Sequence, residues 1–207
     1  MKFPTLLLLS LCTCATAATP ATPIDNDKVT AYEETLQPAE TESGGGGLPN
    51  ITIFLNDGII RHSPATGPAT TAAVKRGEAI FRGPRDGKIT ATGPTGMHLV
   101  RIEFHHPESK IMWGKSGFAP DYKMLVENGY ARTYDIRIAA GKSEPMHSHH
   151  DRVVMCLSGA QLRHVLPDGS KQDSSIATGQ CLWRLGQTHE GNNIGQTDLW
   201  VIAVEPK

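Results

Sequence analysis

The chain has 207 residues and a formal net charge of −1, from 20 Lys and Arg against 21 Asp and Glu. This balance gives no electrostatic indication of a nucleic-acid partner or of binding to an anionic membrane. Glycine and proline recur at short intervals, which favours short strands joined by turns over long helices. We therefore expect a compact, soluble, β-rich protein.

Residues 1–18 predict a signal peptide. Lys2 supplies a short positive region, and the apolar run from Leu6 to Leu11 that follows is too short to span a bilayer. Ala15-Thr16-Ala17 then offers a small-residue cleavage site. We expect the mature chain to be secreted or periplasmic, with no membrane attachment after cleavage.

Short strands with turns between them are predicted in both halves of the chain. The predicted strands are 51–55, 59–61, 153–157, 161–163 and 199–204, and the turns are 56–58, 158–159 and 167–169. Asn56-Asp57-Gly58 between two apolar runs is a strong hairpin signal, and Ser158-Gly159 predicts a second hairpin. The whole pattern is typical of a closed antiparallel barrel or a double-sheet sandwich.

The two halves align with each other at a constant offset of 102 residues, for example between Glu42 and Glu144. Other identical pairs at this offset are Asn26 and Asn128, Tyr32 and Tyr134, Arg61 and Arg163, Arg82 and Arg184, and Glu103 and Glu205. Because no gap is needed, the alignment predicts an internal repeat of two similar modules, 25–105 and 127–207. Residues 106–126, rich in Pro and Gly, predict a linker with one short helix at about 122–127.

Cys156 and Cys181 are the cysteines that remain after the predicted signal peptide. In an oxidising compartment two cysteines can form a disulfide, but sequence spacing alone does not place their Cα atoms within bonding range. Whether they pair stays open.

Three histidines of the second half, His147, His149 and His189, are candidate metal ligands. Residues i and i+2 of a strand project from the same face, so the first two imidazoles can meet at one point. A third imidazole from a distant strand would leave open positions for water or substrate, as catalytic metal sites require. Such ligands suit one divalent transition metal, namely Fe, Mn, Zn, Ni or Cu. The alternative is an exposed polar turn at 147–150 and an unrelated His189.

The run from Gly141 to His149, with Gly159 downstream, resembles the first motif of the cupin superfamily. Gly186, His189 and Asn193 resemble the second. The resemblance implies an all-β fold of two tandem cupin-like antiparallel β-barrels of the double-stranded β-helix or jelly-roll type. It also implies metal ligation by the three histidines, a small-molecule ligand and, because cupins often pair, a homodimer.

This chain departs from the cupin pattern after the paired histidines. The glutamate that cupins usually contribute there is missing: counting forward from the histidines gives Val153 or Val154, and counting back from Gly159 gives Arg152. Arg152 either orients an anionic substrate beside a three-histidine metal or points to solvent and leaves a weaker site. Asp151 is an alternative oxygen ligand. Trp183 and Met155 are candidate pocket-lining residues for substrate, although either residue type is common in a plain core.

In the first module, glycines stand at the places of the three histidines, at Gly45, Gly47 and Gly87. Glycine has no side-chain ligand, so we expect no metal there. We expect this module to pack against the second or to cover a sheet edge, and the run 44–47 to form a flexible loop.

Two functions follow for the chain. One is a metal-dependent enzyme of oxygenase or isomerase type acting on a small, anionic molecule, and the other is a non-enzymatic metal-binding, ligand-binding or structural protein. A centre that is open beside Arg152 would favour catalysis. Closure of the centre by Asp151 or Glu190 would favour storage.

Overall fold

The computed structural model describes residues 21–45, 47–110, 113 and 122–207. The predicted signal peptide, 1–18, lies outside these residues. Within the described ranges the chain forms seventeen β-strands and no α-helix, in agreement with the all-β prediction. The described part of the chain thus contains no helix that is long and apolar enough to cross a membrane.

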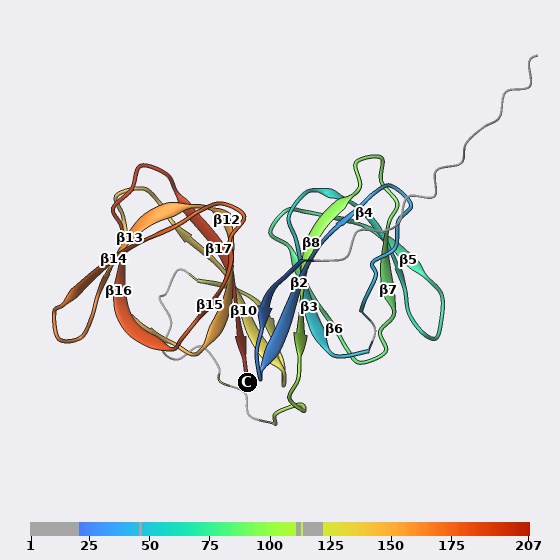
Figure 1. The fold of residues 1–207 in the computed structure, drawn as a ribbon, viewed down its shortest axis with the longest axis horizontal. Helices are drawn as coiled ribbons and strands as arrows, with labels where there is room; N and C mark the ends of the chain where they lie inside the picture. Colours follow the sequence, from blue (N-terminus) through green and yellow to red (C-terminus); the bar gives the residue numbers. More distant parts are fainter. Residues whose placement is uncertain (1–20, 46, 111–112, 114–121) are drawn as a thin grey trace, which may run out of the picture.

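The N-terminal half forms one barrel from two antiparallel sheets (Figure 1). Its strands are β1 (Ala21–Asp25), β2 (Val29–Leu36), β3 (Asn50–Phe54), β4 (Gly58–Ser63), β5 (Thr70–Val74), β6 (Ala79–Arg82), β7 (Lys88–Ala91) and β8 (Met97–Phe104). The larger sheet has the order β1-β2-β8-β3-β6 and the smaller one β5-β4-β7. Consecutive strands thus often lie in different sheets, as in a jelly roll.

The C-terminal half forms a second barrel of the same design (Figure 1). Its strands are β9 (Lys123–Glu127), β10 (Ala131–Ile138), β11 (Ser143–His149), β12 (Arg152–Ser158), β13 (Ala160–Val165), β14 (Lys171–Ile176), β15 (Cys181–Arg184), β16 (Gln187–Asn193) and β17 (Leu199–Pro206). The sheets have the orders β15-β12-β17-β10-β9 and β11-β16-β13-β14. Strands that begin 102 residues apart, such as β2 and β10 or β8 and β17, occupy the same place in the two barrels.

Both predicted hairpins around Asn56-Asp57-Gly58 and Ser158-Gly159 are wrong. Strands β3 and β4 flank the first turn but lie in different sheets, and so do β12 and β13 at the second. Each turn is a corner at which the chain passes from one sheet to the other. The turn at 167–169 does connect two paired strands, because Val165 lies opposite Lys171.

The short helix predicted at about 122–127 is also wrong, because Lys123–Glu127 is strand β9. It pairs antiparallel with β10, with Glu127 opposite Arg132, and so forms the edge strand of the five-stranded sheet beside β10. Asn128 closes the turn by accepting hydrogen bonds on Oδ1 from the backbone N–H groups of Tyr130 and Ala131. The Asn128-Gly129 pair was the sequence signal for this turn.

The two barrels share a hydrophobic core between their five-stranded sheets. From the first barrel it contains, among others, Ile51, Ile53, Val100 and Ile102, and from the second Val153, Met155, Leu157, Ile202 and Val204. Each barrel also has an interior core of its own. The expectation that the first module packs against the second is therefore confirmed.

Cys156 and Cys181 are free thiols. Cys156 belongs to the interior core of the second barrel, whereas Cys181 packs against the core between the barrels. The two side chains therefore lie on opposite faces of one sheet, which leaves no disulfide between them.

Candidate metal centre

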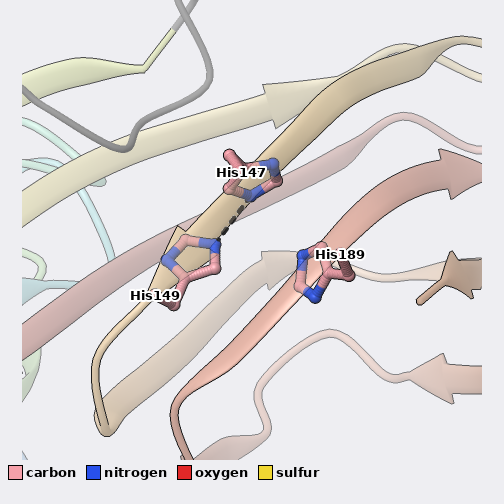
Figure 2. A group of neighbouring side chains, drawn as sticks. All are labelled: His147, His149 and His189. Atoms are coloured by element: carbon pink, nitrogen blue, oxygen red, sulfur yellow. Dashed lines mark hydrogen bonds between the residues drawn. The ribbon is translucent and has the colours of Figure 1, made fainter. Parts of the chain in front are cut away.

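The three predicted histidines come together inside the second barrel (Figure 2). His147 and His149 lie on β11, and His189 lies directly opposite His147 on the neighbouring strand β16. All three are buried, with 5%, 8% and 2% of their surface exposed, and their potential ligand atoms lie within 4.8 Å of one another. The alternative of an exposed polar turn is therefore wrong.

Each of these imidazoles has an oxygen acceptor at Nδ1. For His147 the acceptor is the Pro145 carbonyl at 2.7 Å, for His149 the Glu205 carboxylate at 3.1 Å, and for His189 the Gln187 side-chain carbonyl at 3.1 Å. An oxygen without a proton forces Nδ1 to carry the hydrogen, so the neutral ring presents the lone pair of Nε2. Such partners orient metal-binding histidines.

The Nε2 atoms of His147 and His149 lie only 3.0 Å apart (Figure 2). With both Nδ1 atoms protonated, two nitrogen lone pairs face each other at this distance. A cation bound by both nitrogens removes that repulsion, and ligand atoms of a metal with bonds of about 2.0–2.2 Å lie roughly this far apart. The residues present therefore fit a divalent transition metal.

The electrostatic environment keeps the rings of His149 and His189 neutral. Burial lowers the pKa of His149 to about 4 and that of His189 to about 2. Burial alone would raise the pKa of Glu205, but hydrogen bonds from His149 and Arg132 bring it below its ordinary value. Neutral imidazoles beside an ionised carboxylate are the protonation states that a metal site requires.

Glu144 and Tyr122 also contact the histidines, and the sequence did not single them out as site residues. The Tyr122 hydroxyl lies 3.1 Å from Nε2 of His147 and donates to Oε2 of Glu144 at 2.6 Å. Oε1 of Glu144 lies 3.6 Å from Nε2 of His147 and 3.9 Å from Nε2 of His189. Burial raises the pKa of Glu144. The pairing of Glu144 with Glu42 in the repeat was the available signal.

Arg152 lines a cavity of about 520 Å³, together with His149 and His189. Only 8% of Arg152 is exposed, so the prediction that it points to solvent is wrong. Its Nη1 donates to the backbone carbonyls of His150 at 3.4 Å and Leu185 at 3.3 Å, and no described carboxylate lies within 4.0 Å. Burial lowers the pKa of this guanidinium, and the more distant carboxylates of Glu205 and Glu144 offset only part of that effect.

Of the two predicted pocket-lining residues, only Trp183 borders this cavity, and it also packs against the core between the barrels. Met155 is 1% exposed and lies in that core, so it is not a cavity residue. Side chains alternate along a strand, so Arg152 and Val154 face the barrel interior while Met155 faces the other barrel.

Neither acidic residue that could have closed the site does so. Asp151 forms an ion pair with Lys28 at 2.7 Å and accepts a hydrogen bond from the Gly186 N–H. Glu190 accepts a hydrogen bond from Asn192. Both carboxylates are thus engaged by groups other than the three imidazoles.

In the first barrel an ion-pair cluster of Glu42, Arg82 and Arg101 lies at the place that corresponds to Glu144 and the three histidines of the second barrel. Both carboxylate oxygens of Glu42 are bound by Arg82, at 2.5 and 3.0 Å, and Arg101 lies 3.2 Å from the carboxylate. All three side chains are at most 2% exposed. A Cβ at Gly44 would lie 2.2 Å from Arg101, and one at Gly45 would lie 2.8 Å from Glu42. These two glycines therefore pack on the cluster, and the described residues of the predicted loop 44–47 lie between β2 and β3, outside any strand.

No family profile matches the chain, and no curated protein does. The solved structures to which it is similar include three that each cover most of its length. An IolB-like protein from Salmonella typhimurium LT2 has 12% identity and a TM-score of 0.63, with 94% of this chain and 91% of that chain covered. A cupin 2 conserved barrel domain protein from Leptotrichia buccalis has 10% identity and a TM-score of 0.58, with 93% and 91% covered.

The third structure is the oxalate decarboxylase of Bacillus subtilis, studied for its Mn(II) centres. It has 12% identity and a TM-score of 0.58, with 86% of this chain and 69% of that chain covered. At these identities the likeness shows the fold. The chain has the cupin fold in two barrels, as the sequence resemblance predicted.

Proposed function

We propose that this chain is an exported cupin in which His147, His149 and His189 bind one divalent transition metal beside a site for a small anionic molecule. The observation that carries the proposal is the convergence of three Nε2 atoms whose Nδ1 atoms are all anchored. The Mn(II) centres of the similar oxalate decarboxylase support a divalent metal in this fold. Export follows from the predicted signal peptide, and a homodimer stays a prediction.

Arg152 is the group that selects the substrate in this proposal. It is a buried cation on the cavity wall without a carboxylate partner, and a guanidinium pairs well with a carboxylate or phosphate. Apolar side chains of Ile136, Val154 and Val201 line the same cavity. We therefore expect a small organic anion whose charged group meets Arg152 while its apolar part lies against these residues.

We favour catalysis over storage because Asp151 and Glu190 are bonded elsewhere and leave the centre open toward the cavity. When bound, the metal supplies a Lewis acid or a site for oxygen activation, as in oxygenases and isomerases. The chain would orient the anion through Arg152 and exclude water with the apolar wall. The two barrels at an offset of 102 residues further suggest duplication of one ancestral unit, of which only the second copy has histidines at the three candidate ligand positions.

Elemental analysis tests the metal site. The purified protein should contain about one transition metal per chain, and a variant with His147, His149 and His189 all changed to Ala should contain none after reloading with Mn²⁺, Fe²⁺ or Zn²⁺. Equal metal content in both proteins would overturn the proposal.

Calorimetry with a panel of small mono- and dicarboxylates then tests the anion site in the metal-loaded protein. Arg152→Met should weaken binding by about tenfold or more, because it removes a buried charge-assisted contact. Arg163→Met is the matched control, since Arg163 pairs with Asp173 on the exposed surface. Binding without turnover would favour the non-enzymatic alternative.

A further inference from the structure

Glu144 faces the histidines only because strand β11 carries an extra residue. Side chains alternate along a regular strand, so a residue three positions before His147 should point to the opposite face. Here Glu144 lies opposite Gly191 and His147 opposite His189, so three steps along β11 match two steps along β16. This β-bulge reverses the alternation and turns the carboxylate toward His147 and His189.

The neighbouring strand leaves space for this carboxylate. A Cβ at Gly191 would lie 2.2 Å from Oε1 of Glu144, so any larger residue would displace the carboxylate from its present position. Tyr122 donates to the other oxygen, Oε2, at 2.6 Å, which leaves Oε1 directed toward the imidazoles. One carboxylate oxygen is thus held by the protein, and the other faces the centre.

Among the described residues no Lys or Arg forms an ion pair with Glu144, and the cation Arg152 acts on it only from a longer distance. The Glu144 side chain is 10% exposed, and the described ion pairs join it only to His147 and His189. Buried carboxylates are usually paired with a cation or coordinate a metal. A divalent metal held by the three imidazoles would supply a balancing charge next to the carboxylate.

The first barrel shows how the same position is balanced by guanidinium groups. Glu42 stands 102 residues before Glu144, and Arg82 and Arg101 bind it. The residues at the places of these arginines in the second barrel are Arg184, which is exposed at the border of the cavity and forms no ion pair with Glu144, and Ala203, which also lines the cavity. The second barrel therefore keeps the central carboxylate, lacks the cations that bind it, and has three imidazoles instead.

We infer that Glu144 is the carboxylate ligand of the metal, taking the role of the glutamate that is missing after the paired histidines. This inference rests on the proposed metal site at His147, His149 and His189. The distances of 3.6 and 3.9 Å from Oε1 to two of the Nε2 atoms are close to the roughly 3–3.5 Å between ligand atoms of one metal.

The test is titration of the metal-free full protein with Co²⁺, read out by competition affinity and by the visible absorption of the bound ion. Glu144→Gln keeps the size of the side chain and its contact with Tyr122 but removes the anionic ligand. We expect about a tenfold or greater rise in the Kd for Co²⁺ and a changed visible spectrum. Glu190→Gln is the control, because it makes the same change one residue after His189 at a side chain that is bonded to Asn192. It should change the Kd for Co²⁺ by no more than about twofold and leave the visible spectrum unchanged.

Two further variants separate the possible outcomes. If His147→Ala lowers the Co²⁺ affinity while Glu144→Gln keeps the wild-type affinity and spectrum, the inference about Glu144 is overturned and the proposed metal site stands. If His147→Ala binds as wild type does, the metal site itself fails. Should Glu144→Gln not fold by circular dichroism, Glu144→Asp decides, because its shorter carboxylate should alter the Co²⁺ spectrum and an unchanged spectrum overturns the inference.

Discussion

His149 donates its Nδ1 hydrogen to the carboxylate of Glu205, at 3.1 Å, across the interior of the second barrel. His149 lies on β11 of the four-stranded sheet and Glu205 on β17 of the five-stranded sheet, so this contact joins the two sheets. The same carboxylate pairs with Arg132 at 2.7 Å. Glu205 therefore connects the metal centre to a buried ion pair.

Changing Glu205→Gln should affect metal binding and stability together. The amide still accepts from His149, but it no longer raises the basicity of the ring, so we expect the metal Kd to rise by about 10–100-fold. Loss of the buried ion pair with Arg132 should lower the free energy of unfolding by about 3 kcal/mol. Metal titration and urea unfolding measure the two effects. A variant with unchanged metal affinity would show that the His149–Glu205 contact is only structural.

Arg152→Met should leave the free energy of unfolding within about 1 kcal/mol of wild type. The buried guanidinium is costly to desolvate and gains only two hydrogen bonds to backbone carbonyls, and Met fills a similar volume. Arg82→Met is the comparison, because Glu42 binds both terminal nitrogens of Arg82. That change should lower the free energy of unfolding, measured in urea, by about 3–5 kcal/mol. If both variants lost the same free energy of unfolding, this would contradict the view that Arg152 serves ligand binding and not stability.

Met155→Ala should destabilise the protein without changing metal content. Met155 is 1% exposed in the core between the barrels, and truncation there typically costs about 2–5 kcal/mol. Thermal unfolding should also remain a single transition, because both barrels contribute to that core. Met146→Ala, at a site 47% exposed on β11, should change stability by no more than about 0.5 kcal/mol. Reduced metal content in Met155→Ala would place this residue at the site after all.

Neither cysteine should react readily while the protein is folded. Burial raises the pKa of Cys156 to about 11 and that of Cys181 to about 12, so little thiolate exists at pH 8. Iodoacetamide followed by mass spectrometry should therefore label neither residue in the native mature chain. Both should be labelled in guanidinium chloride without a reductant, since they form no disulfide. A need for reductant would contradict the separation of the two thiols.

The sequence predicted the fold better than it predicted strand pairing. Alternation and turn signals place the strands 153–157 and 199–204, but they do not say which sheet a strand enters after a corner. Asn56-Asp57-Gly58 has hairpin chemistry, yet it joins strands of different sheets, because β3 pairs with β8 and β6 whereas β4 pairs with β5 and β7. Local propensity likewise favoured a helix over Lys123–Glu127, where pairing with the edge of β10 decides the structure.

The candidate histidines His147 and His149 were visible in the sequence because their spacing of two follows the strand period. Glu144 was missed for the opposite reason, since its spacing of three from His147 indicates the wrong face unless a bulge is known. The position of Met155 shows a related limit. Sequence alternation separates the two faces of a strand, but it does not say which face lines the barrel interior when both faces are buried.

The barrel that packs against the second barrel through the shared core belongs to the same polypeptide chain. A separate subunit covering the β12–β17 face would dissociate on dilution, whereas a tethered barrel stays at a high effective concentration whatever the amount of protein. The β12–β17 face of the second barrel is thus covered at nanomolar and at millimolar protein concentrations alike. The first barrel has glycines at the three candidate ligand positions, yet it provides the surface that covers this face of the second barrel.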